Sequence, residues 1–572
     1  MIRHKNKIRI LSLISVTALA TMFSACSGNN NGNASPSTSA SGSESPSVSA
    51  SASAGVSAND LNAKYDPPIT ITAAQLAEST WVYDSGDDLN NNVWTRHFTE
   101  TLGINFKFDW TAAKLEDYTN KLNVMIGSGD KLPDMFQVDA TQLQQLAEAG
   151  QLADLTEVFN KFASPLTKKL MSTDGGIGLS SATFDGKLVA IPNLAGTITA
   201  NDVLWLRADW LKKVGLPEPK SIDDLVAIAD AFVNKDPDGN GKKDTQGLGL
   251  ATGPSLTPGD AADLGGFFSA YNVHPGMWVK DESGKVVYGG IQPGVKDALL
   301  KLQDMYKKGL IDKEWIVKDG GKIGEDIANN KLGMWYGANW NSYWPVNITS
   351  NKDLVNLKPY SLVSAYGAQP VVQMVNPSVA QFTVVKKGFE HPEAIVKLLN
   401  EFQEKMWGET SDSAKFGENK NVTPSITYSK YPLVQSWPMT KDIPDNLDAV
   451  NNAFSTGDTS KLNSEQMGAF DTIKAFNDGD IVKGFGNKRQ FDAFEIIKKD
   501  NLSTQLYSEF YGAPTPTMIT LKASLDKLEQ ETFTKIIMGK GTGDDFDKFV
   551  SDWNKLGGEA ITKEVNEWKA GH

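Results

Sequence analysis

The chain has 572 residues, with 69 acidic and 56 basic side chains and a formal net charge of −13. A phosphate backbone repels such an acidic protein, so we expect no nucleic-acid partner. The single cysteine excludes a disulfide framework, and the five histidines are too dispersed to form a metal motif of the HExxH type.

The N-terminus has the features of a secretory signal. Basic side chains alternate through residues 1–9, and a mostly apolar stretch follows at 10–23. This stretch is shorter than the about 20 residues that span a bilayer, so residues 1–25 are predicted to be a cleaved signal peptide. The next residues, Ser24-Ala25-Cys26, resemble the lipobox of bacterial lipoproteins. That resemblance implies lipidation of Cys26 and anchoring on the extracytoplasmic face of the cell membrane; an ordinary signal with an incidental cysteine is the alternative.

Residues 26–63 are predicted to be a flexible, Ser-rich tether. Between Asn29 and Asp60 the sequence contains no Lys, no Arg and no aromatic residue. Such a segment cannot bury enough apolar surface to offset the loss of chain entropy on folding. The folded body is therefore expected to comprise the remainder of the chain.

Strand-like and helix-like segments alternate through this body. Strands are predicted at 69–73, 105–110, 187–191, 203–207, 332–336 and 380–386. Three helices have clear signals: one is capped by Ser221, one opens at Pro293 and ends at Gly309, and one follows Pro392. The alternation predicts an α/β protein with largely parallel sheets.

Several segments, taken in order, carry a family resemblance. They read KLNVMIGSG at 121–129, EAGQLADL at 148–155, DGKLVAIP at 185–192, LWLRADWL at 204–211 and KLGMWYG at 331–337. Together they resemble the family 1 extracellular solute-binding proteins of bacterial ABC importers, and in particular the larger oligosaccharide-binding members. Two family tyrosines are replaced, by Val189 and Leu206.

The resemblance implies a periplasmic-binding-protein-like fold, in which two α/β lobes are joined by hinge crossings around a ligand cleft. The expected N-terminal lobe comprises residues 64–196 and 376–470. The C-terminal lobe comprises residues 197–375 and 471–572. Crossings are expected near 193–202 and 369–378, with a third between 440 and 515.

The implied function is capture of an oligosaccharide by lobe closure and its delivery to the membrane permease subunits of an ABC importer, without bond chemistry. We expect a monomer. The alternative is a surface polysaccharide-active enzyme, a glycoside hydrolase or lyase, with paired carboxylates in the cleft. A calcium-stabilised adhesin ranks last, because the chain lacks repeats.

A sugar site needs aromatic rings for C–H faces and polar groups for hydroxyls. Loop positions with that mixture provide the candidates, although each aromatic residue has core packing as an alternative. Arg207 is the cation suggested for a uronic acid. The predicted substrate-binding residues are Asp139, Thr141, Gln142, Trp205, Arg207, Tyr271, Trp278, Asn339, Trp340, Tyr343, Trp344 and Tyr511.

The segment from 236 to 244 fits the first nine positions of a calcium-binding loop. Gly241 stands at the tight turn, and Gly247 replaces the usual bidentate Glu at the end. The loop resembles an EF-hand-like loop without its second helix, and a polar turn is the alternative. We expect a structural calcium ion; its predicted ligands are Asp236, Asp238, Asn240, the Lys242 carbonyl and Asp244.

Overall fold

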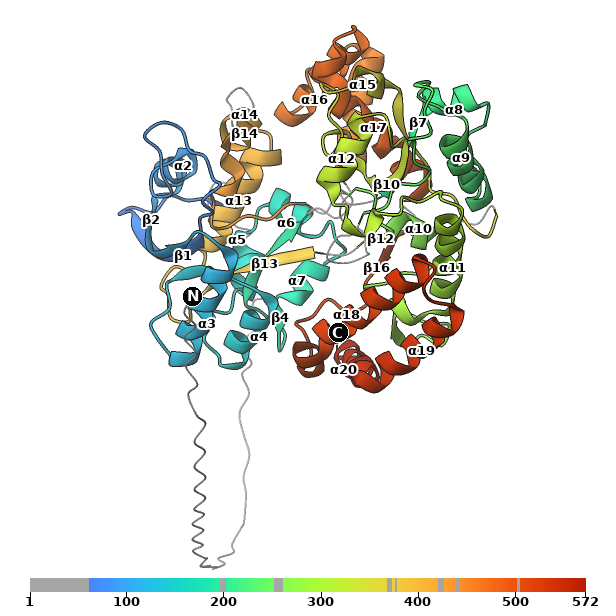
Figure 1. The fold of residues 1–572 in the computed structure, drawn as a ribbon. Helices are drawn as coiled ribbons and strands as arrows, with labels where there is room; N and C mark the ends of the chain where they lie inside the picture. The colour runs from blue at the N-terminus through green and yellow to red at the C-terminus, as the bar shows by residue number, and fades with distance from the viewer. Residues whose placement is uncertain are drawn as a thin grey trace, which may run out of the picture. The chain divides into compact units, whose positions relative to one another are not determined.

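Two larger sheets, each with its own helices and its own buried core, organise the described part of the chain (Figure 1). The structure is a computed structural model and describes residues 61–195, 202–251, 261–367, 373–375, 378–419, 426–438, 442–501 and 505–571. The predicted signal peptide, Cys26 and nearly all of the tether lie outside these ranges. None of the helices in the described ranges is both long enough and apolar enough to cross a bilayer.

The first sheet has five strands in the order β2–β1–β3–β13–β6. β1 runs parallel to β2 and β3, whereas β13 runs antiparallel to β3 and β6. The strands are β1 (Ile69–Leu76), β2 (Ile104–Ala112), β3 (Met135–Val138), β6 (Ala190–Ala195) and β13 (Ser378–Val385). Because β13 comes from a distant part of the sequence, this lobe is discontinuous.

The helices of the first lobe pack around this sheet. They are α2 (Val93–Leu102), α3 (Leu115–Ser128), α4 (Ala140–Glu148), α5 (Thr156–Phe162), α6 (Pro165–Met171), α7 (Ile177–Ser181), α13 (Ala394–Trp407) and α14 (Ser413–Phe416). In α2, Trp94, Phe98 and Leu102 recur every four residues and are buried. The helix ends at Gly103, whose φ of 67° lies in the left-handed region that glycine adopts without strain.

The second sheet has three antiparallel strands in the order β10–β7–β11. They are β10 (Met334–Ala338), β7 (Asp202–Arg207) and β11 (Leu357–Tyr360). All six residues of β7 are buried. Its helices are α8 (Ala208–Val214), α9 (Ile222–Asn234), α10 (Gly265–Ala270), α11 (Pro293–Lys307), α12 (Gly320–Ala328), α15 (Asp442–Thr456), α16 (Ser464–Asn477), α17 (Ile481–Asn501), α18 (Pro516–Ile537), α19 (Gly543–Trp553) and α20 (Glu559–Ala570).

Short strand pairs complete the described elements. Strand β12 (Gln373–Val375) runs parallel to β16 (Gln505–Tyr507). The antiparallel pairs are β4 (Thr183–Phe184) with β5 (Lys187–Leu188), β8 (Trp278–Lys280) with β9 (Val286–Tyr288), and β14 (Glu418–Asn419) with β15 (Ile426–Thr427). Leu447 of α15 and Phe485 of α17 share a core cluster with Trp205 of β7. Helices α15 and α17 therefore pack with the second sheet.

The α/β class and the two-lobed architecture are confirmed, and Ser221 caps α9 as expected. The expectation of largely parallel sheets is wrong for the second sheet. An uninterrupted apolar strand is typical of a parallel sheet, but β7 has this character because both of its faces are covered. The expected crossings near 193–202 and 369–378 fall partly outside the described residues.

Candidate functional site

Four aromatic residues form what we call the first-lobe aromatic surface: Trp81, Tyr83, Tyr428 and Tyr431. The first two lie in the loop that follows β1, and the other two lie in and directly after the short helix η6 (Tyr428–Lys430). In sheets built from parallel strands, ligands bind beyond the carboxyl ends of the strands. The loop after β1 occupies such a position.

The rings of this surface support one another. Tyr83 stacks on Tyr431 with ring centroids 4.7 Å apart, and the Trp81 ring lies 5.9 Å from Tyr431. Tyr428 and Tyr431 are buried, whereas Trp81 and Tyr83 are half-buried. Two covered tyrosines thus support two rings that solvent, or a ligand, can reach.

Buried polar side chains fasten the segment around Tyr431 to the sheet. The Gln75 amide of β1 donates to the Tyr431 carbonyl at 2.9 Å. The Leu433 carbonyl accepts from the Gln137 amide of β3 at 3.1 Å and from the Thr383 hydroxyl of β13 at 3.2 Å. Side chains from three neighbouring strands therefore hold the main chain that carries the Tyr431 ring.

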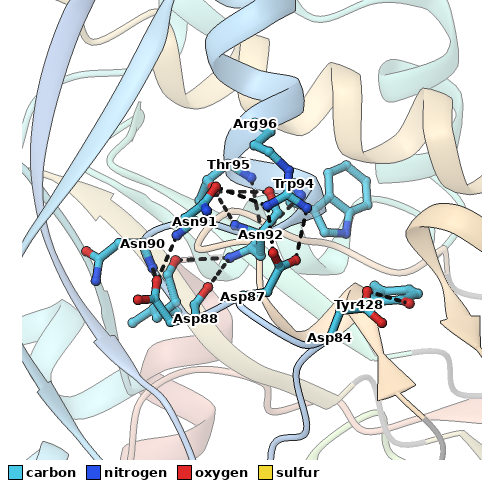
Figure 2. A network of polar contacts seen from close by, with 11 residues as sticks. Asp84, Asp87, Asp88, Asn90, Asn91, Asn92, Trp94, Thr95, Arg96 and Tyr428 are labelled. Carbon is cyan, nitrogen blue, oxygen red and sulfur yellow. Dashed lines mark hydrogen bonds and ion pairs between the residues drawn. The ribbon is translucent and has the colours of Figure 1, made fainter. Parts of the chain in front are cut away.

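A network of acidic and amide side chains follows Trp81 and Tyr83 in the sequence, and Figure 2 shows it together with Tyr428. The Tyr428 hydroxyl donates to Asp84 at 2.9 Å, and Arg96 donates two bonds, of 2.8 and 2.9 Å, to Asp87. Asp88 accepts from the main-chain N–H groups of residues 90 and 91. Burial and then the Asp88 charge raise the pKa of Tyr83. Burial also raises the pKa of Tyr431, and Asp84 and Asp87 add to that shift.

The predicted aromatic loop of the second lobe forms a second exposed group, which we call the second-lobe aromatic surface: Trp340, Tyr343 and Trp344. Tyr343 is 47% exposed and Trp344 is 44% exposed. The Trp340 and Trp344 rings stack with centroids 6.2 Å apart. These are unusually large apolar groups to leave in solvent side by side.

Glycines and buried amides fix the position of this surface. A Cβ atom at Gly486 of α17 would overlap the Tyr343 ring, and one at Gly320 of α12 would overlap the Trp344 ring. Both rings therefore lie directly on main chain. The Ser342 hydroxyl donates to the Gly486 carbonyl at 2.9 Å. Asn339 is fully buried and accepts from Gln490 at 3.3 Å.

The structure places four predicted site residues inside the second-lobe core instead. Trp205 is fully buried and donates to the Ala338 carbonyl at 3.1 Å. Arg207 is 2% exposed and is bound by Asp209, at 2.8 and 2.6 Å, and by Asn330. Tyr271 and Trp278 are also buried. In this structure none of these four side chains is available to a ligand.

The remaining predicted positions lie elsewhere. Tyr511 is half-buried and packs edge-on against Trp568, with centroids 4.8 Å apart. Asp139 and Gln142 bond reciprocally at the start of α4, and the Gln142 amide also donates to Asn123. These residues and Thr141 line an open cavity of about 600 Å³ between α3 and α4. Gln142 serves as a helix cap, so its amide is occupied.

The predicted calcium loop is ordered by its own side chains. Asp236 accepts from three main-chain N–H groups, those of residues 239, 240 and 241. The Asn240 amide donates to Asp238 at 2.7 Å and to Asp244 at 3.1 Å. A hydrogen bond with Asp238 holds the pKa of Asp236 below its usual range, and burial followed by Asp236 raises the pKa of Asp238. Within the described ranges, His, Cys, Asp and Glu side chains alone form no metal-binding group of three or more.

The first-lobe aromatic surface was missed from the sequence. Its signal is the Trp-Val-Tyr run at 81–83, followed by the Asp/Asn-rich stretch 84–92, directly after the first strand. Such a run also suits core packing. Only the return of the chain at 428–431 identifies the partners of Trp81 and Tyr83.

Comparisons with known proteins give consistent results. The model of the bacterial extracellular solute-binding protein family matches residues 94–402. The chain is similar to the fructooligosaccharide ABC transporter substrate-binding protein FusA of Streptococcus pneumoniae serotype 4, with 27% identity over 48% of this chain and 51% of FusA. It is also similar to the polygalacturonan/rhamnogalacturonan-binding protein YtcQ of Bacillus subtilis, with 22% identity over 68% of this chain and 71% of YtcQ. The chain spans about half the length of the first curated relatives it matches.

A solved structure has the same fold. It is the EF-hand mutant of Streptococcus pneumoniae FusA in complex with fructo-nystose. The TM-score is 0.58 at 18% sequence identity, and the alignment covers 88% of this chain and 99% of that chain. At this identity the similarity establishes the fold and leaves the ligand open.

Proposed function

This chain belongs to the bacterial extracellular solute-binding proteins, and from that premise we propose that it captures an oligosaccharide for an ABC importer. The observation that carries the proposal is the pair of aromatic surfaces, one on each lobe, each with rings that solvent can reach and each packed against main chain or buried side chains. Members of this family bind solutes without bond chemistry, and no finding supports the alternative of a polysaccharide-active enzyme.

Each surface offers what a pyranose or furanose ring needs. Trp81 and Tyr83 in the first lobe, and Tyr343 and Trp344 in the second, offer flat faces for sugar C–H groups. Asp84 and the neighbouring Asp and Asn side chains offer acceptors and donors for hydroxyl groups. Contacts to both lobes would favour a closed state, because a ligand shifts a conformational equilibrium only by binding its two states differently.

Two features of the N-terminus support an anchored location. The basic and apolar residues before Cys26 match a lipoprotein signal, and the Ser-rich tether would let the body reach a permease. We propose that Cys26 carries the lipid and that the body functions as a monomer outside the cell membrane.

A structural calcium ion is a further part of the proposal. The donor set of the 236–244 loop is all oxygen, which suits a hard cation. Asp236, Asp238 and Asp244 would supply carboxylates, and Asn240 and the Lys242 carbonyl would supply neutral oxygens. The Asn240 bonds to Asp238 and Asp244 already gather three of these side chains. The charge of the ion would offset the repulsion between the carboxylates.

The lobe boundaries are proposed with one change. Because Leu447 shares a core with Trp205, we place the third crossing before α15, so that residues 376–438 belong to the first lobe and 442–572 to the second.

Titration of the mature protein with oligosaccharides tests the proposed function. We expect heat with a stoichiometry of one and recovery of the sugar unchanged, as measured by calorimetry followed by chromatography of the recovered ligand. Cleavage of the sugar, or the absence of binding across neutral and acidic oligosaccharides, would refute the proposal.

A further inference from the structure

We infer that the oligosaccharide is uncharged, and that the acidic border of the first-lobe aromatic surface rejects uronate sugars. This inference rests on the proposed function and narrows the class of ligand. The names of the two relatives leave the question open, because one denotes a fructooligosaccharide protein and the other a polygalacturonan protein. Fructose units carry no charge, whereas each galacturonate unit carries one carboxylate.

Carboxylates lie around the accessible rings of the first-lobe aromatic surface. The Tyr428 hydroxyl donates to the Asp84 carboxylate at 2.9 Å. The Asp88 charge acts on Tyr83, and the Asp84 and Asp87 charges act on Tyr431. Three carboxylates therefore surround a surface on which the ligand would stack.

The guanidinium of Arg96 is paired with a carboxylate. Arg96 is the basic side chain in this network, and both of its bonds to acidic groups go to Asp87 (Figure 2). This pairing offsets the Asp87 charge, so the remaining local charges are the two carboxylates of Asp84 and Asp88 and one exposed cation, Lys430 of η6. A uronate placed on Tyr83 would meet two carboxylates and a cation that is already neutralised by its partner.

Arg207, the cation suggested by the sequence, is not accessible to a ligand. Arg207 is 2% exposed, and its guanidinium is occupied by Asp209 and Asn330. It has no route to a ligand carboxylate in this structure. The suggestion that Arg207 accommodates a uronic acid therefore loses its support.

The cations beside the second-lobe aromatic surface are also mostly paired. On α17, Lys488 and Arg489 both form ion pairs with Asp492. Lys483, three residues before Gly486, is exposed. Lys483 therefore provides the control, as an exposed cation on the same helix as Gly486.

The effect has a usable size. One pair of like charges about 4 Å apart in a water-like medium disfavours binding by about five-fold. Asp84 and Asp88 together would then weaken a uronate by about 25-fold relative to a neutral sugar of the same shape. The same carboxylates can accept hydrogen bonds from sugar hydroxyls, so they would help a neutral ligand and oppose an anionic one.

The experiment is a matched calorimetric titration of the full mature chain. One set of probes contains neutral fructo-, xylo- and malto-oligosaccharides, and the other contains oligogalacturonate and oligoalginate of equal length. Each probe is measured at about 20 mM and about 500 mM NaCl, because added salt screens Coulombic contributions. The variants are Asp84→Asn with Asp88→Asn, which removes charge, and Lys483→Ala as the control.

We expect binding within the neutral set, with dissociation constants that change by less than about two-fold between the two salt concentrations. Asp84→Asn with Asp88→Asn should narrow the gap between uronate and neutral affinity by about 25-fold, whereas Lys483→Ala should leave the neutral affinity unchanged. Tighter binding of a uronate than of every neutral probe, or loss of ligand binding in Lys483→Ala, would overturn the inference while leaving oligosaccharide capture in place. Absence of binding to either set would refute the proposed function itself.

Discussion

The hydroxyl of Tyr428 donates a hydrogen bond of 2.9 Å to the carboxylate of Asp84, although 344 positions separate the two residues in the sequence. This contact joins the loop after β1 to the chain segment after β15. The first-lobe aromatic surface exists only because these two segments meet. The stacking of Tyr83 and Trp81 against Tyr431 depends on that meeting.

Replacing Tyr428 by Phe should loosen the loop while keeping the ring. A hydrogen bond to a charged acceptor contributes about 1.5–3 kcal/mol, and part of that loss should appear as a fall in ligand affinity of about 5-fold or more. Calorimetry of the variant measures it. Tyr306→Phe, on α11 of the second lobe, is the control; equal effects of the two variants would contradict the assigned role.

Trp344→Ala should reduce sugar affinity, whereas Trp205→Ala should reduce the stability of the fold. Trp344 is 44% exposed, whereas Trp205 is fully buried. Removing Trp344 should lower sugar affinity by about 1–2 kcal/mol and leave the melting temperature nearly unchanged. Removing Trp205 should destabilise the fold by about 3–5 kcal/mol. Thermal denaturation and calorimetry on both variants separate the two effects, and a stable Trp205→Ala protein that no longer binds sugar would restore Trp205 to the site.

Glu529 should make stability depend on pH. Burial raises the pKa of Glu529 from its ordinary value of 4.5 to about 7, so the folded state holds the proton over a range in which the unfolded chain has lost it. Its favourable contribution is therefore fully present below about pH 4.5 and is lost as the pH rises through about 7. The Glu529→Gln variant has no charge to bury at this position. Its free energy of unfolding should therefore rise by about 3 kcal/mol relative to that of the wild type between pH 4.5 and pH 8.

Denaturant unfolding of the Glu529→Gln and wild-type proteins at both pH values measures this difference. Burial lowers the pKa of His274 to about 4, which acts in the opposite direction. That contribution is common to both proteins and cancels in the comparison. A constant difference between them across this pH range would contradict the prediction.

The proposed calcium ion should stabilise the second lobe. A ligand that binds the folded state alone adds RT ln(1 + [L]/Kd), or about 2.7 kcal/mol at a hundred-fold excess over Kd. A chelator should therefore lower the melting temperature by a few degrees. Asp236→Ala should abolish the response to the chelator, whereas Asp312→Ala, outside the loop, should retain it.

Periodic and local signals were sufficient to predict much of the fold. The cap at Ser221 and the apolar runs of β1, β7 and β13 are encoded within a few residues each. The antiparallel pairing of β7 was not predictable, because a strand covered on both faces has the same composition in either direction.

The site was harder to predict, because exposure depends on distant neighbours. Trp205 lies within β7 and Trp344 in the loop after β10, and both were candidates from their sequence context, yet one is core and the other faces solvent. Arg207 looked available until Asp209 and Asn330 were placed around it. The loop at 339–344 was identified because two Trp, one Tyr and two Asn occur together in six residues.

The glycines beneath the second-lobe rings affect the space that is left for a ligand. Tyr343 and Trp344 lie on the main chain of Gly486 and Gly320. The backbone at these glycines therefore limits how deeply each ring can pack. One added methyl group at either glycine would lift its ring outward and narrow the space left for a sugar. Substitution of either glycine would then change ligand affinity through the ring that lies on it.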